Sequence, residues 1–446
     1  MLMTTQPLMQ HQLDALPLLM GDASLFLAYE PGLGKSRTCI EALDRLKIKG
    51  PILVVCPAIA RENWRNEFAK WGAVPRGVVV GKPDKVSGNV FVTSYDAISL
   101  MKPATRDKFL KHQWNAAIFD EAHRLKEKTA KRTKYIYGAN CSMQKAIAAN
   151  AKRVWLLSGT PAPNHVGELW THLKALNPQA IATIDGTPMR LEQFQDVYCK
   201  VRTTSFGRQI SGSKNIPHLK SKMAGWFLPK RERDCVNNLP ALLWDTYPLP
   251  TDNLDQKLLA QLDKELAPYA QSPDPVAALR GAGAHIATER KLLGKLKVPL
   301  VAQMIQNELE NSGSDHKIIV FAQHKDVIDH LANFLTQYVP VVVDGRTSDK
   351  DRNRHIGLFQ NDPLVRVFIG QIQATGEAIN LTAANRVIFA EPSWTPKDNF
   401  QCVKRAHRIG QGSHVRATFA VLANSMDQQI LCAVERKTRD LSVVMS

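Results

Sequence analysis

Residues 24–36 read SLFLAYEPGLGKS, an apolar run that leads into a glycine-rich loop and then into a segment compatible with a helix. A buried strand followed by a tight loop and a helix is the opening unit of a parallel α/β sheet. The glycines let the backbone approach a bound group, so amides at the start of the helix can surround a phosphate. The candidate phosphate-binding residues are Gly32, Leu33, Gly34, Lys35 and Ser36.

Within this loop, Lys35 has the reach to contact β- and γ-phosphates, and the Ser36 hydroxyl is a candidate Mg²⁺ ligand. The strict phosphate-loop pattern is broken at its first position, where Tyr29 stands in place of glycine. A glycine-rich turn with no ligand is the structural alternative, and the loop alone does not exclude it.

A second motif, AAIFDEAH at residues 116–123, places two carboxylates where a buried strand ends. Ligands of open α/β sheets collect at the carboxyl ends of strands. We expect Asp120 to hold Mg²⁺ through water and Glu121 to orient and deprotonate an attacking water. An acidic helix N-cap is the alternative for such a pair, but the upstream glycine-rich loop argues against it.

The charge of the chain indicates a polyanionic partner. The sequence holds 58 Lys and Arg against 41 Asp and Glu, a net charge of +17. Basic side chains neutralise the phosphates of nucleic acid, which is therefore the first candidate, and an anionic membrane surface is the second. No apolar run approaches the roughly 20 residues of a membrane span. The seven cysteines form no C-x-x-C pair, so we expect no zinc site, no disulfides and a cytoplasmic protein.

Short apolar runs alternate with helix-like segments between residues 51 and 157, and the alternation returns after residue 317. This pattern predicts two α/β lobes, residues 1–235 and 236–446, each with a parallel sheet flanked by helices. Helical candidates between them predict a protrusion from about residue 165 and a linker that ends near residue 312. Residues 201–214 are basic and rich in Gly and Ser, which favours an exposed loop, either solvated or touching nucleic acid.

A helical segment at residues 61–71 carries Trp64 and Trp71 seven positions apart, a spacing that favours packing in the core. In the second lobe, QCVKRAHRIGQ places Arg405 and Arg408 three positions apart, close to one face of a helix. An arginine supplied by a second lobe can neutralise charge on a transferring phosphoryl group, typically worth about 10³ to 10⁵ in rate. A solvated basic face is the alternative for this segment.

Taken together, these segments resemble the ordered motifs of superfamily-two helicases, in particular the Swi/Snf-type DNA-dependent ATPases. PLMQHQLDA resembles the family's glutamine motif and LVVCPAIARENWRNEFAKW its next motif, and TSYDAI and LLSGTPAPNHVGELW follow in the expected order. TGEAINLTAA and RAHRIGQ are the most specific phrases. The resemblance covers most of the chain and implies two tandem RecA-like lobes, with the compact annealing-helicase-like branch as the nearest group.

The resemblance also implies roles for individual residues. Gln12 would contact adenine and Gly376 would approach the nucleotide from the second lobe. The residues expected to relay the nucleotide state are His123, Ser158, Gly159 and Thr160. The candidates for DNA contact are Thr93, Ser94, Thr375 and Trp394. Trp394 has packing under a loop as an equal alternative.

The function implied is an ATP- and Mg²⁺-dependent translocase on double-stranded or forked DNA, which remodels DNA or protein–DNA complexes. A strand-separating helicase is one alternative, and an ATP-gated DNA-binding module with negligible turnover is another. We expect a monomer without a membrane partner, of bacterial or bacteriophage origin on size alone.

Overall fold

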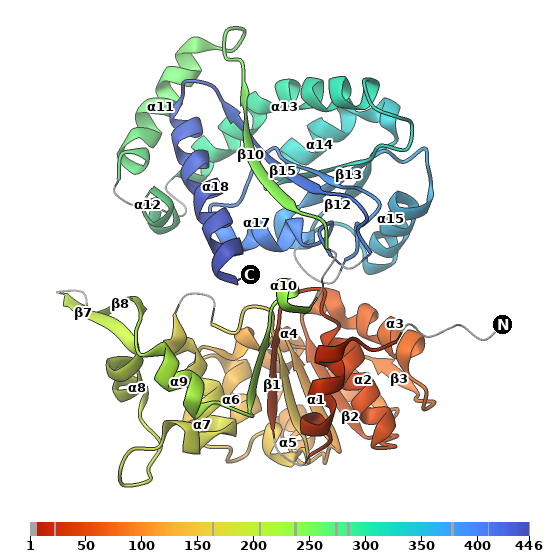
Figure 1. The fold of residues 1–446 in the computed structure, drawn as a ribbon, viewed down its shortest axis with the longest axis vertical. Coiled ribbons are helices and arrows are strands. Elements are labelled where there is room, and N and C mark those ends of the chain that lie inside the picture. The colour runs from red at the N-terminus through yellow and green to blue at the C-terminus, as the bar shows by residue number, and fades with distance from the viewer. Residues whose placement is uncertain are drawn as a thin grey trace. The chain divides into compact units, whose positions relative to one another are not determined.

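The computed structural model describes residues 7–21, 24–162, 165–204, 207–235, 239–272, 275–282, 286–375, 379–408 and 410–445. The chain divides into two compact units, Met1–Cys235 and Val236–Ser446, which we call lobe 1 and lobe 2 (Figure 1). Each lobe is built on its own parallel sheet, which confirms the predicted α/β fold.

Lobe 1 contains a seven-stranded sheet in the order β3-β4-β2-β5-β6-β1-β9, and every pairing in it is parallel. Its strands are β1 (Leu25–Tyr29), β2 (Ile52–Cys56), β3 (Val78–Val80), β4 (Val90–Ser94), β5 (Ala116–Asp120), β6 (Val154–Leu157) and β9 (Phe227–Lys230). β1, β2 and β4 are buried along their whole length, because helices cover both faces. For that reason these strands are continuous apolar runs in the sequence.

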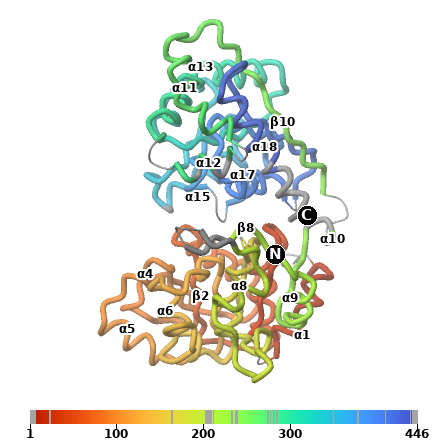
Figure 2. Tube along the Cα trace, turned by 90° about the vertical axis from the view of Figure 1, so that its left-hand side faces the viewer, coloured from red at the N-terminus to blue at the C-terminus, as the bar shows by residue number. Residues whose placement is uncertain are grey.

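The helices that flank this sheet are α1 (Gln10–Met20), α2 (Lys35–Arg45), α3 (Arg61–Trp71), α4 (Tyr95–Ser99), α5 (Pro103–Phe109) and α6 (Lys131–Tyr137). Within lobe 1, Figure 1 shows α1, α2 and α3 on one side of the sheet and α6 and α9 (Ile216–Lys222) on the other, the side that Figure 2 turns toward the viewer. Helix α9 packs there in the same hydrophobic cluster as α4 and α5. Both faces of the sheet are thereby covered.

Beyond β6 the chain forms η6 (Val166–Leu169), α7 (Trp170–Leu176) and α8 (Leu191–Tyr198). The predicted exposed loop at 201–214 is wrong, because most of it forms an antiparallel hairpin of β7 (Cys199–Thr204) and β8 (Gly207–Ser213). Val201 pairs with Ile210 in this hairpin. The β-branched residues of the segment favour extended backbone and outweigh its glycine and serine content.

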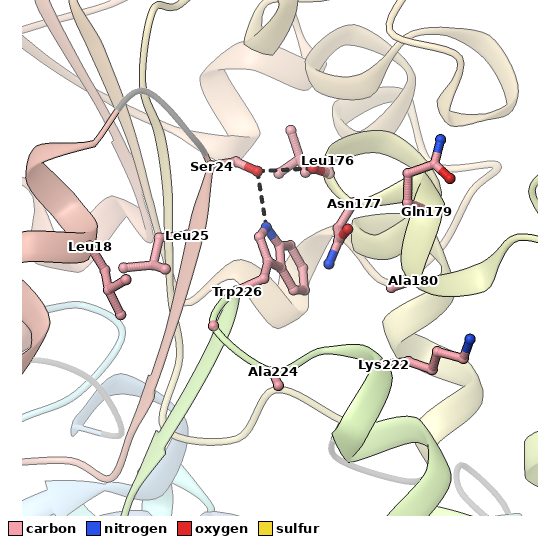
Figure 3. Close-up of a pocket in the computed structure, with 11 residues that line it drawn as sticks. Leu18, Ser24, Leu25, Leu176, Asn177, Gln179, Ala180, Lys222, Ala224 and Trp226 are labelled. Carbon is pink, nitrogen blue, oxygen red and sulfur yellow. Dashed lines mark hydrogen bonds between the residues drawn. The ribbon is translucent and has the colours of Figure 1, made fainter.

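Strand β9 returns to the edge of the sheet beside β1 and was not predicted. Its sequence, FLPK, contains Pro229, which is tolerated because an edge strand leaves one row of backbone groups unpaired. The Trp226 indole N–H donates to Ser24 Oγ at 2.9 Å, and the Ser24 hydroxyl donates to the Leu176 carbonyl at 2.9 Å (Figure 3). This chain of bonds ties β1, β9 and α7 together beside a cavity of about 530 Å³.

Lobe 2 contains a six-stranded parallel sheet in the order β10-β15-β14-β11-β13-β12. Its strands are β10 (Leu242–Leu249), β11 (Ile318–Ala322), β12 (Val341–Val343), β13 (Val367–Gln371), β14 (Arg386–Phe389) and β15 (Val415–Leu422). Its helices are α11 (Gln256–Ala270), α12 (Pro275–Ala282), α13 (Ala287–Glu310), α14 (Lys325–Phe334), α15 (Asp349–Asn361), α16 (Ile372–Thr375), α17 (Pro396–Val403) and α18 (Met426–Met445).

Helix α13 packs into the core of lobe 2 through Val298, Val301 and Ile305. Its Lys297 is buried and bonds Asp427 Oδ2 at 3.2 Å and the Ala420 carbonyl at 2.9 Å, which joins α13 to α18 and β15. Helix α13, in the helical stretch before β11, is therefore part of the core of lobe 2. Among the described helices, none is both long and apolar enough to cross a membrane.

Buried His172 makes the stability of lobe 1 depend on pH. Its Nδ1 lies 2.9 Å from the Tyr137 hydroxyl, and burial, aided by the charge of His123, lowers the pKa of His172 to about 3. The unfolded chain binds a proton near pH 6.5 that the folded chain excludes, so stability falls as the pH falls below 6.5.

We therefore expect the stability advantage of the parent over His172→Gln to shrink by roughly 2 kcal/mol between pH 7 and pH 5. Urea unfolding of both proteins at the two pH values measures it. An advantage that is the same at both values would contradict the buried neutral imidazole.

Candidate nucleotide site

The order of strands brings three predicted motifs to one edge of the sheet of lobe 1. Strands β5, β6 and β1 are neighbours and parallel, so the segments that follow them leave from the same edge. These segments begin at Glu121, Ser158 and Glu30. The two carboxylates (Asp120 and Glu121), the SGT motif (Ser158–Thr160) and the glycine-rich loop are therefore adjacent. Ligands of open α/β sheets bind at this edge, where the strands end.

The glycine-rich loop holds a backbone shape that side chains disfavour. Gly32 has φ 90° and Gly34 has φ 72°, and Gly34 is the N-cap residue of α2. A Cβ atom at Gly34 would lie 2.1 Å from Gln12 Nε2. The amides at the start of α2 are thereby turned toward the loop, the arrangement that binds phosphate at helix N-termini.

Helix α1 holds this loop from outside. His11 Nε2 lies 2.9 Å from the Leu33 carbonyl, and Gln12 Nε2 lies 3.4 Å from the same oxygen. The Tyr29 hydroxyl donates to the His11 carbonyl at 3.0 Å. Tyr29, which departs from the strict phosphate-loop pattern, therefore joins β1 to α1. The adenine contact predicted for Gln12 stays a prediction, and the role of His11 carried no sequence signal.

The Lys35 ammonium group lies within the loop itself. Its Nζ donates to the Tyr29 carbonyl at 2.8 Å and to the Glu30 carbonyl at 3.2 Å. These main-chain acceptors hold the cation beside the loop at the edge of the sheet. An anion bound there would meet a positive charge already in place.

Asp120 is held in position by aromatic side chains. The Trp64 indole N–H donates to Asp120 Oδ2 at 2.9 Å, and the Tyr95 hydroxyl donates to the Asp120 carbonyl at 2.8 Å. Trp64 is buried as predicted, and it also orients a carboxylate, which periodicity could not indicate. The prediction for Trp71 is wrong: its ring is half-buried and lies under the Arg37 guanidinium at 4.2 Å.

Glu121 begins a series of close polar contacts that reaches the SGT motif (Ser158, Gly159 and Thr160). Its φ is 51°, a left-handed conformation that is uncommon for a residue with a side chain. His123 Nδ1 lies 3.1 Å from Glu121 Oε2 and 3.0 Å from Ser158 Oγ. Ser158 Oγ also accepts the Thr160 amide at 3.1 Å.

Gly159 packs against the phosphate loop, since a Cβ there would lie 2.8 Å from Pro31 Cδ. The structure thus brings His123, Ser158, Gly159 and Thr160 together. Their coupling role stays a prediction.

In lobe 2 the structure joins the TGEAINL and RAHRIGQ segments. The Leu381 amide donates to the Arg405 carbonyl at 2.9 Å, and Arg408 Nη1 donates to the Ile379 carbonyl at 3.1 Å. The expectation that both arginines share a helix face is wrong, because α17 ends at Val403. Gly376 lies outside the described residues.

Between these arginines, His407 is buried, with Nε2 2.7 Å from the Pro240 carbonyl and Nδ1 3.1 Å from Lys404 Nζ. Burial, reinforced by the Lys404 charge, lowers the pKa of His407 to about 4. The ring is therefore neutral at physiological pH and serves to fix the turn that carries Arg405 and Arg408.

The four predicted DNA contacts are all buried in their lobes: Thr93, Ser94, Thr375 and Trp394. Ser94 Oγ caps α4 by accepting the Ala97 amide, and Thr375 Oγ1 donates to the Gln371 carbonyl. The Arg290 guanidinium lies 4.3 Å over the Trp394 ring. For Trp394 this geometry favours the packing alternative, and contact of all four with DNA stays a prediction.

A glycine-rich loop beside two adjacent carboxylates, with a second parallel lobe that carries the RAHRIGQ segment, is typical of helicase-like ATPases. The SNF2-related domain family matches residues 12–240, more than half of the chain, and the helicase conserved C-terminal domain matches residues 298–410. The chain therefore belongs to the SNF2-related family, which confirms the resemblance seen in its motifs.

Two relatives illustrate this kinship. The chain is 29% identical over 437 residues to the SWI/SNF-related matrix-associated actin-dependent regulator of chromatin subfamily A-like protein 1 of Xenopus tropicalis, covering 94% of this chain and 43% of the relative. It is 27% identical over 440 residues to the DNA annealing helicase and endonuclease ZRANB3 of Bos taurus, covering 94% and 38%. The chain thus spans less than half the length of these relatives.

Among solved structures, the Sulfolobus solfataricus SWI2/SNF2 ATPase core in complex with dsDNA matches at 21% identity with a TM-score of 0.44. That match covers 99% of this chain and 95% of the other.

The contact between Gly34 and Gln12 can be tested with a matched pair of glycines. Gly34 and Gly225 have nearly equal φ values, 72° and 78°, but a Cβ at Gly225 would meet nothing within 4 Å. Both alanine variants carry the backbone strain of about 1 kcal/mol. We expect Gly34→Ala alone to push the Gln12 side chain away from the Leu33 carbonyl and to weaken ATP binding about fivefold, by removing a hydrogen bond that helps hold the loop.

Calorimetric titration with ATP measures both variants. Equal affinities for Gly34→Ala and Gly225→Ala would show that the contact with Gln12 does not shape the loop.

Proposed function

We propose that this chain is an ATP-dependent translocase on double-stranded DNA that uses its movement to remodel DNA or protein–DNA complexes. The observation that carries the proposal is the adjacency of the glycine-rich loop, Glu121 and Ser158 at the carboxyl edge of lobe 1. Membership of the SNF2-related family supports it. So do the names of the relatives, one an annealing helicase acting on DNA.

The loop fits the triphosphate of ATP. Gly32 and Gly34 supply the left-handed backbone that a phosphate cradle needs, and a side chain at Gly34 would collide with Gln12. Lys35 would exchange its main-chain acceptors for the β- and γ-phosphates, gaining a charge-assisted bond. Leu33 contributes its backbone, which α1 already holds in place.

The residues present also fit a magnesium ion. Ser36 at the start of α2 offers a hydroxyl, and Asp120 offers a carboxylate that the Trp64 indole keeps in one orientation. These are hard oxygen ligands of the kind that Mg²⁺ binds together with phosphates and water. The ion, when bound, neutralises charge on the phosphates.

Glu121 is the proposed general base. It follows Asp120 directly and its Oε2 lies 3.1 Å from His123 Nδ1, so its carboxylate is held between the metal side and the SGT motif. From there it would orient a water for attack on the γ-phosphate and accept its proton. The contacts from His123 to Ser158 would pass the state of the nucleotide along the sheet edge.

Arg405 and Arg408 of lobe 2 would complete the site when the lobes close. Their charge would stabilise the transferring phosphoryl group, and Gly376 would approach the nucleotide from the same side. Closing with ATP and opening after hydrolysis would alternate the grip of the two lobes on DNA. The net charge of +17 favours a duplex or forked DNA partner, which a monomer would track along one strand.

Steady-state ATP hydrolysis tests the proposal. We expect duplex or forked DNA to stimulate the rate by at least about tenfold. Glu121→Gln should abolish the stimulated rate, because an amide cannot accept the proton of the attacking water. The control is Glu62→Gln, which removes a half-buried carboxylate paired with Arg65 on α3. Hydrolysis that responds to no DNA, or only to RNA, would overturn the proposal.

A further inference from the structure

The base of the β7–β8 hairpin rests on the short helix η6. Cys199 and Ser213 are the paired residues at this base. Ser213 Oγ accepts the Val166 amide at 3.1 Å. On the other strand, Cys199 Sγ would be 3.0 Å from a Cβ at Gly167, so η6 and β7 approach each other closely at this glycine. Both strands of the hairpin therefore contact consecutive residues of η6.

The next residue of η6 contacts the segment that carries the catalytic motif. Glu168 is buried to 9% exposure, and its Oε1 lies 2.6 Å from Lys126 Nζ. Because Glu168 follows Gly167 directly, a shift of the hairpin base would move one partner of this ion pair. An ion pair with one buried partner responds to such a shift more strongly than an exposed pair, since water screens it less.

Lys126 in turn is close to the proposed base in the chain. It is the C-cap residue of η3 (Ala122–Leu125), and Glu121 is the N-cap residue of the same helix. The Lys126 amide donates to the His123 carbonyl at 3.3 Å. His123 Nδ1 contacts both Glu121 Oε2 and Ser158 Oγ. A continuous series of contacts thus runs from the hairpin base through η6 to Glu121.

The hairpin base also carries positive charge. Lys200 and Lys214 are both exposed there, and the Lys200 side chain passes over Gly212, whose Cβ position is 3.8 Å from Lys200 Cδ. No Asp or Glu occurs between residues 199 and 214. Figure 1 shows the hairpin at the periphery of lobe 1. An exposed basic site of this kind suits a phosphate backbone.

We propose that Lys200 and Lys214 contact the phosphate backbone of duplex DNA, and that η6 and the Lys126–Glu168 ion pair carry this contact to His123 and Glu121. The inference rests on the proposed function and adds its regulation: DNA at the hairpin base accelerates hydrolysis by positioning the base. Lys126 and Glu168 are positioning residues, since they act through His123.

Glu168→Gln tests the relay, because it keeps the shape of the side chain and removes its charge. We expect the maximal duplex-stimulated rate to fall about fivefold or more, the low end of typical coupling, while the DNA-free rate falls less than twofold. Lys126→Gln gives the same result, and the double variant is no worse than either single, because the two act as one unit.

The matched control is Glu192→Gln. It removes a second Lys–Glu pair in the same lobe, with Lys128 at 3.6 Å. Glu192 is more exposed than Glu168, and the pair lies outside the series of contacts. Its stimulated rate should equal that of the parent. Parallel loss of DNA-free and stimulated rates in the Glu168 and Lys126 variants, or unchanged stimulation in both, overturns the relay.

The DNA contact is tested separately with Lys200→Gln/Lys214→Gln, two exposed changes that leave the fold intact. We expect a higher duplex concentration for half-maximal stimulation, and a log–log salt dependence shallower by about 2, near 0.9 for each lost phosphate contact. An unchanged salt slope overturns the contact. If duplex DNA fails to stimulate the parent, the proposed function fails. If duplex DNA stimulates the parent and all the variants equally, only this inference fails.

Discussion

The chemistry of lobe 1 depends on the parallel adjacency of β5, β6 and β1. Because their carboxyl ends share one edge, three motifs far apart in the sequence meet there: Asp120 with Glu121, the SGT motif at Ser158, and the glycine-rich loop. Buried strands rich in Val, Leu, Ile and Phe hold this edge rigid. The rigid sheet edge therefore sets the distances between the carboxylates, the Ser158 hydroxyl and the amides of the glycine-rich loop.

Rigid packing also supports the strained backbone of the site. Gly32 and Gly34 adopt positive φ, and Glu121 does so despite its side chain, at a cost of about 1 to 3 kcal/mol for such a residue. The contacts of α1 with Leu33, of Trp64 with Asp120 and of His123 with Ser158 offset that cost. The contacts of His123 with Glu121 and Ser158, and of Gly159 with Pro31, connect the carboxylates, the SGT motif and the loop.

The sequence predicted the parts of this structure that have local signals. Central strands such as β2 and β11 are continuous apolar runs, and the DEAH and GLGKS segments have their own spacing. Edge strand β9 was missed because it contains Pro229, which disfavours a strand. The β7–β8 hairpin was missed because its glycine and serine content favoured a loop, although its β-branched residues favour strands.

The contacts of Trp64 with Asp120 and of His11 with Leu33 join residues 56 and 22 positions apart, and no periodicity encodes such distances. The same holds for the turn that carries Arg405. This turn follows the end of α17 and is held by the hydrogen bond from the Leu381 amide to the Arg405 carbonyl. Displacement of a third DNA strand from a duplex, with ATP present, tests the central claim most directly because it reports movement without strand separation. Translocation predicts ATP-dependent displacement by the parent and none by Glu121→Gln. Duplex-stimulated hydrolysis with no displacement would contradict it.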